Sequence, residues 1–127
     1  MRIFDCFMFY DEEVVLDIRL NSLKNFVDCF VIVESKFYHN GKKRELKFDI
    51  NNYPKFKDKI IYIVQDEEPT NLRNLEKDDE EWRKSNKLIY NAHLRESFQR
   101  NLISKGLNKA NEDDLIMISD VDEIPNL

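Results

Sequence analysis

The first third of the chain places one helical stripe between two apolar runs. Residues 3–9 and 30–33 are nearly continuous apolar runs, which are typical of strands in a sheet covered on both faces. Between them, apolar side chains recur at helical spacing behind Asp11, the expected N-cap; they are Leu16, Leu20, Leu23 and Val27. Strand, helix and strand in this order predict a βαβ unit with a right-handed crossover.

A long polar stretch separates this unit from the next apolar run. Residues 35–59 are irregular in pattern, with a short edge element predicted at Leu46 and Phe48. Residues 60–64 then form a third apolar run, which ends in an acidic loop. We therefore expect a third strand that is reached by a long connection rather than by a second regular helix.

The last third contains one long helical pattern and one more apolar run. The helix is predicted over residues 80–105, with Trp82 as a core anchor and Gly106 in the left-handed conformation at its end. Residues 115–118 form the fourth strand-like run. The order of elements predicts an α/β fold with an open, mostly parallel sheet flanked by helices.

The fourth run ends directly in two carboxylates that are one residue apart. In an extended segment residues i and i+2 project to the same side, so Asp120 and Asp122 are expected to converge. Paired carboxylate oxygens suit Mg²⁺ or Mn²⁺, particularly when a substrate diphosphate completes the ligand shell. The pattern predicts a metal site at Asp120 and Asp122.

Other acidic residues follow the remaining strands. Glu34 comes after the second strand and Asp66 after the third, and ligands of open α/β sheets bind beyond the carboxyl ends of the strands. We therefore expect Glu34, Asp66 and Asp120 at one edge of the sheet. Glu34 is either a partner of a nucleotide base or ribose or a solvated charge at a strand end.

Three further polar residues have two interpretations each. Arg100 is predicted either to bind donor phosphate in a bidentate way or to pair with Glu96 one helical turn away. Asn101 either contacts the loop that carries Asp120 or faces water. Glu123 is either a third metal ligand or a residue that orients the other two.

Composition excludes several classes of protein. A net charge of −5 argues against a nucleic-acid surface, and two glycines leave no glycine-rich phosphate loop. No apolar run reaches the length of a membrane span, so a cytoplasmic protein is expected. Cys6 and Cys29 lie in apolar runs and are expected to be buried free thiols rather than a disulfide. The length suits a single domain over residues 1–127.

Longer motifs carry a resemblance to a known family. The opening residues 3–9, the run 30–34 and the segment 98–101 lead to Ser119-Asp120-Val121-Asp122-Glu123-Ile124-Pro125. Together they resemble glycosyltransferase family 17, the β-1,4-mannosyl-glycoprotein β-1,4-N-acetylglucosaminyltransferases and their relatives, from Met1 to Pro125.

The resemblance implies a GT-A fold, a UDP-sugar donor such as UDP-GlcNAc, a glycan acceptor, Mn²⁺ or Mg²⁺, and inversion at the anomeric carbon. It implies that Asp122 ligates the metal directly and that Asp120 does so through water or holds the ribose. Glu34, Arg100 and Asn101 complete the expected nucleotide-sugar site. No general base is named by the motifs.

Family members continue beyond Leu127, so the chain is expected to be the nucleotide-binding half of such an enzyme. Two other classes stay open: a non-catalytic nucleotide-sugar-binding module, and a phosphoryl-transfer enzyme that uses the two aspartates for magnesium. An edge strand with Ile116 and Ile118 exposed also predicts self-association.

Overall fold

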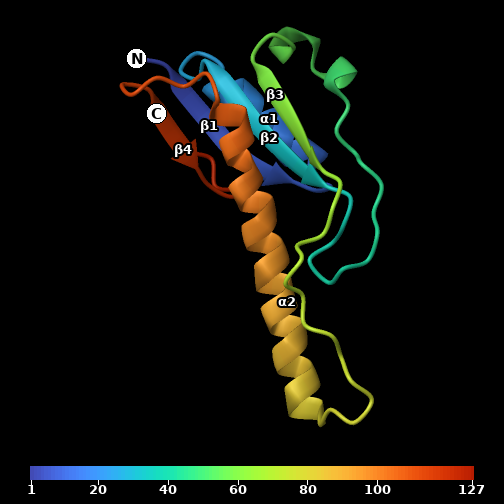
Figure 1. Cartoon of the computed structure of the whole chain (residues 1–127). Coiled ribbons are helices and arrows are strands. Elements are labelled where there is room, and N and C mark those ends of the chain that lie inside the picture. Colours follow the sequence, from blue (N-terminus) through green and yellow to red (C-terminus); the bar gives the residue numbers. More distant parts are fainter.

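The computed structural model describes residues 1–127 and contains one sheet of four parallel strands in the order β3-β2-β1-β4 (Figure 1). The strands are β1 (Ile3–Phe9), β2 (Cys29–Ser35), β3 (Ile60–Gln65) and β4 (Leu115–Ile118). All three strand pairings are parallel. The predicted α/β fold with an open parallel sheet is confirmed.

The two central strands bury both of their faces because each face has its own cover. On one face Phe7 and Phe30 pack with α1 (Glu13–Leu23), whose apolar stripe is buried as predicted. On the other face Cys6 and Val31 pack with η3 (Leu102–Leu107), the short 3₁₀ helix that follows α2 (Glu81–Asn101). Alternation along each strand therefore supplies two separate cores.

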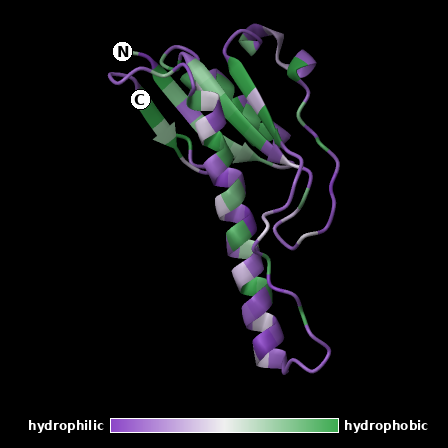
Figure 2. Ribbon diagram, viewed as in Figure 1, coloured by the Kyte–Doolittle hydropathy of each residue, from purple (hydrophilic) through white to green (hydrophobic).

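Only the last turns of α2 and the following η3 lie against the sheet (Figure 1). The first half of α2 extends past the sheet and is mostly hydrophilic (Figure 2). Trp82 is 57% exposed, so the prediction that it anchors the core is wrong. A helix of 21 residues is about 30 Å long, whereas strands of six or seven residues cover only about 20 Å, so half of the helix has no sheet to pack on.

Gly106 does not adopt the predicted left-handed conformation, because Gly41 is the only residue with a positive φ. Because Gly106 has no side chain, η3 can lie close to β2. A Cβ at this position would lie 2.5 Å from Cγ1 of Val31, so a larger residue would push η3 away from β2. The chain continues as a 3₁₀ helix here instead of stopping.

The connection between β2 and β3 contains η1 (Ile50–Asn52) and η2 (Pro54–Phe56). The edge element predicted at Leu46 and Phe48 does not form. Phe48 instead packs its ring against Tyr53 and Tyr62. Aromatic contact, rather than strand pairing, holds this segment on the sheet.

Two further predictions concern the surface and the thiols. Cys6 is buried, Cys29 is partly buried, and both are free, as predicted. On the edge strand β4 the exposed apolar side chains are Leu115 and Ile118, whereas Ile116 packs inward, which corrects the predicted pair. Neither helix combines the length and apolar character that crossing a membrane would require.

Candidate functional site

The strand order creates one position where neighbouring strands lead away in opposite directions. From β1 the chain continues to β2 and β3 on one side, whereas β4 lies on the other side. Such a switch point opens a crevice at the carboxyl ends of the strands. A cavity of about 390 Å³ lies there, and its polar lining comes from Tyr10, Glu12, His39, Glu96, Asp120 and Asp122.

The segment after β4 is a tight turn rather than the extended chain that the sequence suggested. The amide of Glu123 donates to the carbonyl of Asp120 at 2.9 Å, and the amide of Asp120 donates to Oε1 of Glu123 at 3.0 Å. Val121 points into the core. Asp120 and Asp122 still line the same cavity, although the chain between them is a turn and not the extended segment that was predicted.

A buried arginine from α1 holds this turn. Nε and Nη2 of Arg19 donate to the two carboxylate oxygens of Asp5 at 2.8 and 2.7 Å, and neither side chain is exposed. Nη2 also donates to Oγ of Ser119 at 2.6 Å. Nη1 donates to three backbone carbonyls of the turn, at 2.6, 3.1 and 3.2 Å; they belong to Asp120, Val121 and Glu123.

Sequence reasoning missed this pair, although both partners leave a signal. Arg19 interrupts the apolar stripe of α1 next to Leu20, and Asp5 interrupts the apolar run of β1. A charge at a core position of a helix and an opposite charge in a buried strand are each uncommon, because burial of an unpaired charge is costly. Their coincidence could have predicted an internal ion pair.

The predicted phosphate ligand Arg100 lies close to the turn. Its Nη2 contacts Glu96 at 2.9 Å, which confirms the intrahelical pair, and lies 3.8 Å from Oδ1 of Asp120. Partial loss of hydration, followed by the negative charge of Glu123, raises the pKa of Asp120, and Arg100 opposes this shift. Asn101 is exposed, and its side chain forms no hydrogen bond.

The opposite wall of the cavity is aromatic. The ring of Tyr10 meets that of His39 edge to face, with centroids 5.3 Å apart. The Tyr10 hydroxyl donates to Oε1 of Gln99 at 2.5 Å and forms a second hydrogen bond with Nε2 of His39, also at 2.5 Å. Nε2 of Gln99 donates to the carbonyl of Val33.

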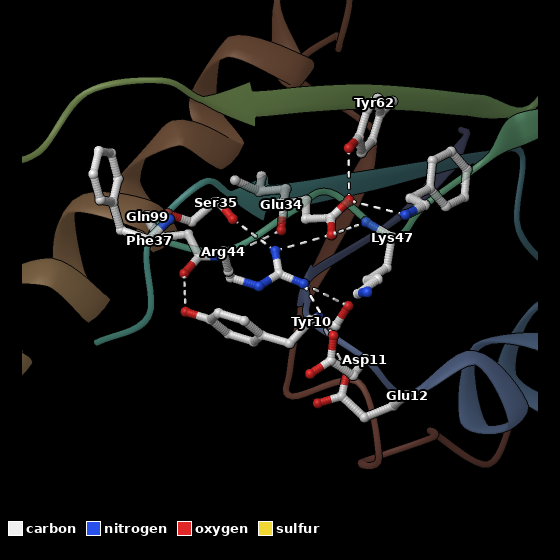
Figure 3. A network of polar contacts seen from close by, with 12 residues as sticks. Tyr10, Asp11, Glu12, Glu34, Ser35, Phe37, Arg44, Lys47, Tyr62 and Gln99 are labelled. Atoms are coloured by element: carbon white, nitrogen blue, oxygen red, sulfur yellow. Dashed lines mark hydrogen bonds and ion pairs between the residues drawn. The ribbon is translucent and has the colours of Figure 1, made fainter. Parts of the chain in front are cut away.

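Glu34 is neither solvated nor free. Its side chain is fully buried, and it accepts from Arg44 at 2.9 Å and from the Tyr62 hydroxyl at 2.6 Å (Figure 3). The amides of Lys47 and Phe48 complete its partners. The interpretation as a solvated charge is wrong, because the loop after β2 folds back over the strand end. The nucleotide contact stays a prediction that this internal network does not favour.

Asp66 lies apart from the two aspartates of the turn. It follows β3, at the opposite edge of the sheet from β4, and pairs with Lys36 at 2.6 Å. It lines a separate cavity of about 280 Å³. Asp66 and Asp120 therefore both follow the carboxyl ends of their strands, but they line different cavities.

The turn offers carboxylates suited to a hard divalent cation, with open space beside them. Asp120 has 60% of its side chain exposed, and Asp122 is also exposed. No three His, Cys, Asp or Glu side chains are arranged to hold an ion by themselves. This donor set fits Mg²⁺ or Mn²⁺ bound jointly with oxygen atoms of a substrate and water.

The domain thus combines an open parallel α/β sheet with two carboxylates at the switch point of that sheet. Residues 1–127 match glycosyltransferase family 17. The chain belongs to this family, as the sequence motifs had indicated.

Named relatives cover most of this chain. The beta-1,4-mannosyl-glycoprotein 4-beta-N-acetylglucosaminyltransferases of Homo sapiens and Rattus norvegicus are each 30% identical to it over 115 residues, which is 87% of this chain and 19% of the relative. The chain thus spans about a fifth of the length of these curated relatives. No solved structure matches it.

Proposed function

We propose that this chain is the donor-binding part of a glycosyltransferase that uses a UDP-sugar, UDP-GlcNAc by preference, together with Mn²⁺ or Mg²⁺. The observation that carries this proposal is the position of Asp120 and Asp122 in one cavity at the switch point of the sheet. The N-acetylglucosaminyl group in the names of the relatives supports the choice of sugar.

Within this proposal, Asp122 ligates the metal directly, and Asp120 acts through water or holds the ribose. The bound ion would supply Lewis-acid neutralisation of the diphosphate leaving group. Arg100, already beside Asp120, is placed to turn its guanidinium from Glu96 to a phosphate oxygen. The rings of Tyr10 and His39 give a flat ligand group a wall to pack on.

The transfer itself is proposed to invert the anomeric carbon and to use a glycan acceptor. An inverting transfer requires a base for the proton of the acceptor hydroxyl. None of the residues described so far is assigned that role. We therefore expect this chain to bind the donor, and transfer of the sugar requires a second assay.

Calorimetric titration of UDP and UDP-GlcNAc, with and without Mn²⁺, tests donor binding. We expect Mn²⁺-dependent binding by the parent and its loss in Asp122→Asn. Asp66→Asn is the matched control, because that carboxylate also follows a strand but lines another cavity. Equal binding by parent and Asp122→Asn would show that the metal site is wrongly assigned.

Transfer is tested by supplying UDP-GlcNAc and a mannose-terminated glycan and following the anomeric proton of the product by NMR. A β-linked product from the α-linked donor would support the inverting enzyme. Donor binding without any product would support the alternative, a non-catalytic nucleotide-sugar-binding module.

A further inference from the structure

The turn that carries Asp120 and Asp122 has few means of holding its own shape. Its internal hydrogen bonds join only Asp120, Ser119 and Glu123 to one another. The side chains of both aspartates line the cavity, where the only ion pair is the long one between Asp120 and Arg100, at 3.8 Å. Its shape must therefore come from contacts made on the protein side of the turn.

Val121 is buried in the core and the amide of Ser119 donates to the carbonyl of Cys6, but most of the polar contacts converge on Arg19. A guanidinium has five N–H donors in a rigid plane, and here every nitrogen has an acceptor. One edge of the plane is fixed by Asp5, and the face stacks on Phe7 at 4.5 Å from the ring centre. The remaining donors are thereby aimed at the turn in a single orientation.

We propose that Arg19, oriented by Asp5, is the positioning residue of the metal-binding turn, and that it sets the direction in which Asp120 and Asp122 face the cavity. The proposal rests on the proposed function for the identity of the ligand. The carbonyls of the turn point inward to Arg19, so the intervening carboxylates are left to point outward. Residues that orient metal ligands commonly control metal affinity by 10–100-fold.

The chain contains a matched control in Arg44. It is also a buried arginine with a buried carboxylate partner, Glu34, but it makes no contact with the turn. Arg19→Lys and Arg44→Lys both preserve charge and replace the planar fork with a single ammonium, which cannot reach two sets of acceptors at once. Ser119→Ala is a milder change at a half-buried position, because it leaves Arg19 in place and removes one of its contacts together with the bond from the Ser119 hydroxyl to the carbonyl of Glu123.

Two readouts on ¹⁵N-labelled protein separate positioning from general stability. The first is hydrogen exchange of the Glu123 amide in metal-free buffer, and the second is the affinity for Mn²⁺ alone, from water-proton relaxation. We expect Arg19→Lys to accelerate this exchange at least tenfold and to weaken Mn²⁺ binding about tenfold. Arg44→Lys should leave both values within about twofold, and Ser119→Ala should fall between.

The two readouts also distinguish the failure of this proposal from that of the proposed function. Parent-like exchange and Mn²⁺ affinity in Arg19→Lys, or equal effects of Arg19→Lys and Arg44→Lys, would overturn the positioning role. If Arg19→Lys does not fold, the same comparison is made with Ser119→Ala, whose parent-like behaviour would overturn it. A parent that binds no Mn²⁺ would overturn the metal assignment, while amide exchange would still decide whether Arg19 positions the turn.

Discussion

Arg19 and Arg44 are both buried and each is paired with a buried carboxylate, but they hold different segments of the chain in place. Arg19 directs its spare donors to one short turn, and all of its nitrogens have partners. Arg44 spreads its donors over Ser35, Tyr10 and Asp11, and its Nε has none. The Arg19–Asp5 pair, the turn centre, thus binds only the turn at the cavity. The Arg44–Glu34 pair, the distributed centre, attaches a long loop to the ends of the strands.

The carboxylates differ in the same sense. Asp5 accepts from Arg19 alone among side chains, through both oxygens. Glu34 accepts from two side chains and two backbone amides. Because the Asp5 pair has no substitute partner, we expect the turn centre to be the more sensitive of the two to a single change.

The largest effect is expected for Asp5→Ala. It leaves the buried guanidinium of Arg19 without its counter-charge, and such a loss typically costs about 3–5 kcal/mol in the free energy of unfolding. Urea denaturation followed by circular dichroism measures this value. Asp17→Ala, at an exposed position of α1, serves as the control and should change stability by less than about 0.5 kcal/mol.

Glu34→Gln tests the distributed centre and should cost less, about 2–3 kcal/mol by the same denaturation measurement. The amide keeps one oxygen for its donors but cannot accept at both positions. If Glu34→Gln proved more damaging than Asp5→Ala, the distinction between a concentrated and a distributed centre would be wrong.

Tyr62→Phe removes one donor from Glu34 without changing the packing of the ring. Burial, together with the neighbouring carboxylate, raises the pKa of the Tyr62 hydroxyl, so it remains a donor throughout the neutral range. A hydrogen bond to a charged group contributes about 1.5–3 kcal/mol, and the three remaining partners should hold the loss near the lower value. Tyr53→Phe is a suitable control, since its hydroxyl forms no hydrogen bond. If Tyr62→Phe lowered the free energy of unfolding as much as Glu34→Gln does, this single hydrogen bond would account for most of the stabilisation by Glu34.

The smallest effect, and one of opposite sign, is expected for Asp120→Asn. A carboxylate whose folded pKa is raised binds its proton more tightly when folded, so its ionised form lowers stability at neutral pH. Without metal, the variant should melt slightly above the parent at pH 7, and the difference should vanish as the pH falls through the pKa of Asp120. With Mn²⁺ the order should reverse, as thermal denaturation would show. A variant less stable than the parent in metal-free buffer would contradict the prediction.

The sequence was sufficient for the elements that bury continuous apolar runs. The strands at 3–9, 60–65 and 115–118 and the helix behind Asp11 lie close to their expected positions, because each strand is a short continuous run of apolar residues. The edge of the sheet at which Asp120 lies followed from the same reasoning.

The sequence was insufficient where the outcome depended on a distant partner. Glu34 looks like a solvated charge at a strand end until Arg44 is placed beside it, and the partner of Asp5 comes from a different element of the chain. Trp82 belongs to the same predicted helix as Ile103, which does reach the core, but periodicity does not tell where the sheet beneath the helix ends. Asp120 and Asp122 line one cavity by way of a turn that is hydrogen-bonded to a residue about a hundred positions earlier.

The long separation between Arg19 and the turn has a consequence for the order of folding. Their contacts join residues 100 to 104 positions apart, and the central strand β1 gains its neighbour β4 only from the same distant segment. Contacts of such separation form late, because a large loop must close first. During synthesis the Arg19–Asp5 pair can assemble from the first βαβ unit before residues 119–123 have been made, and it is then ready to bind them.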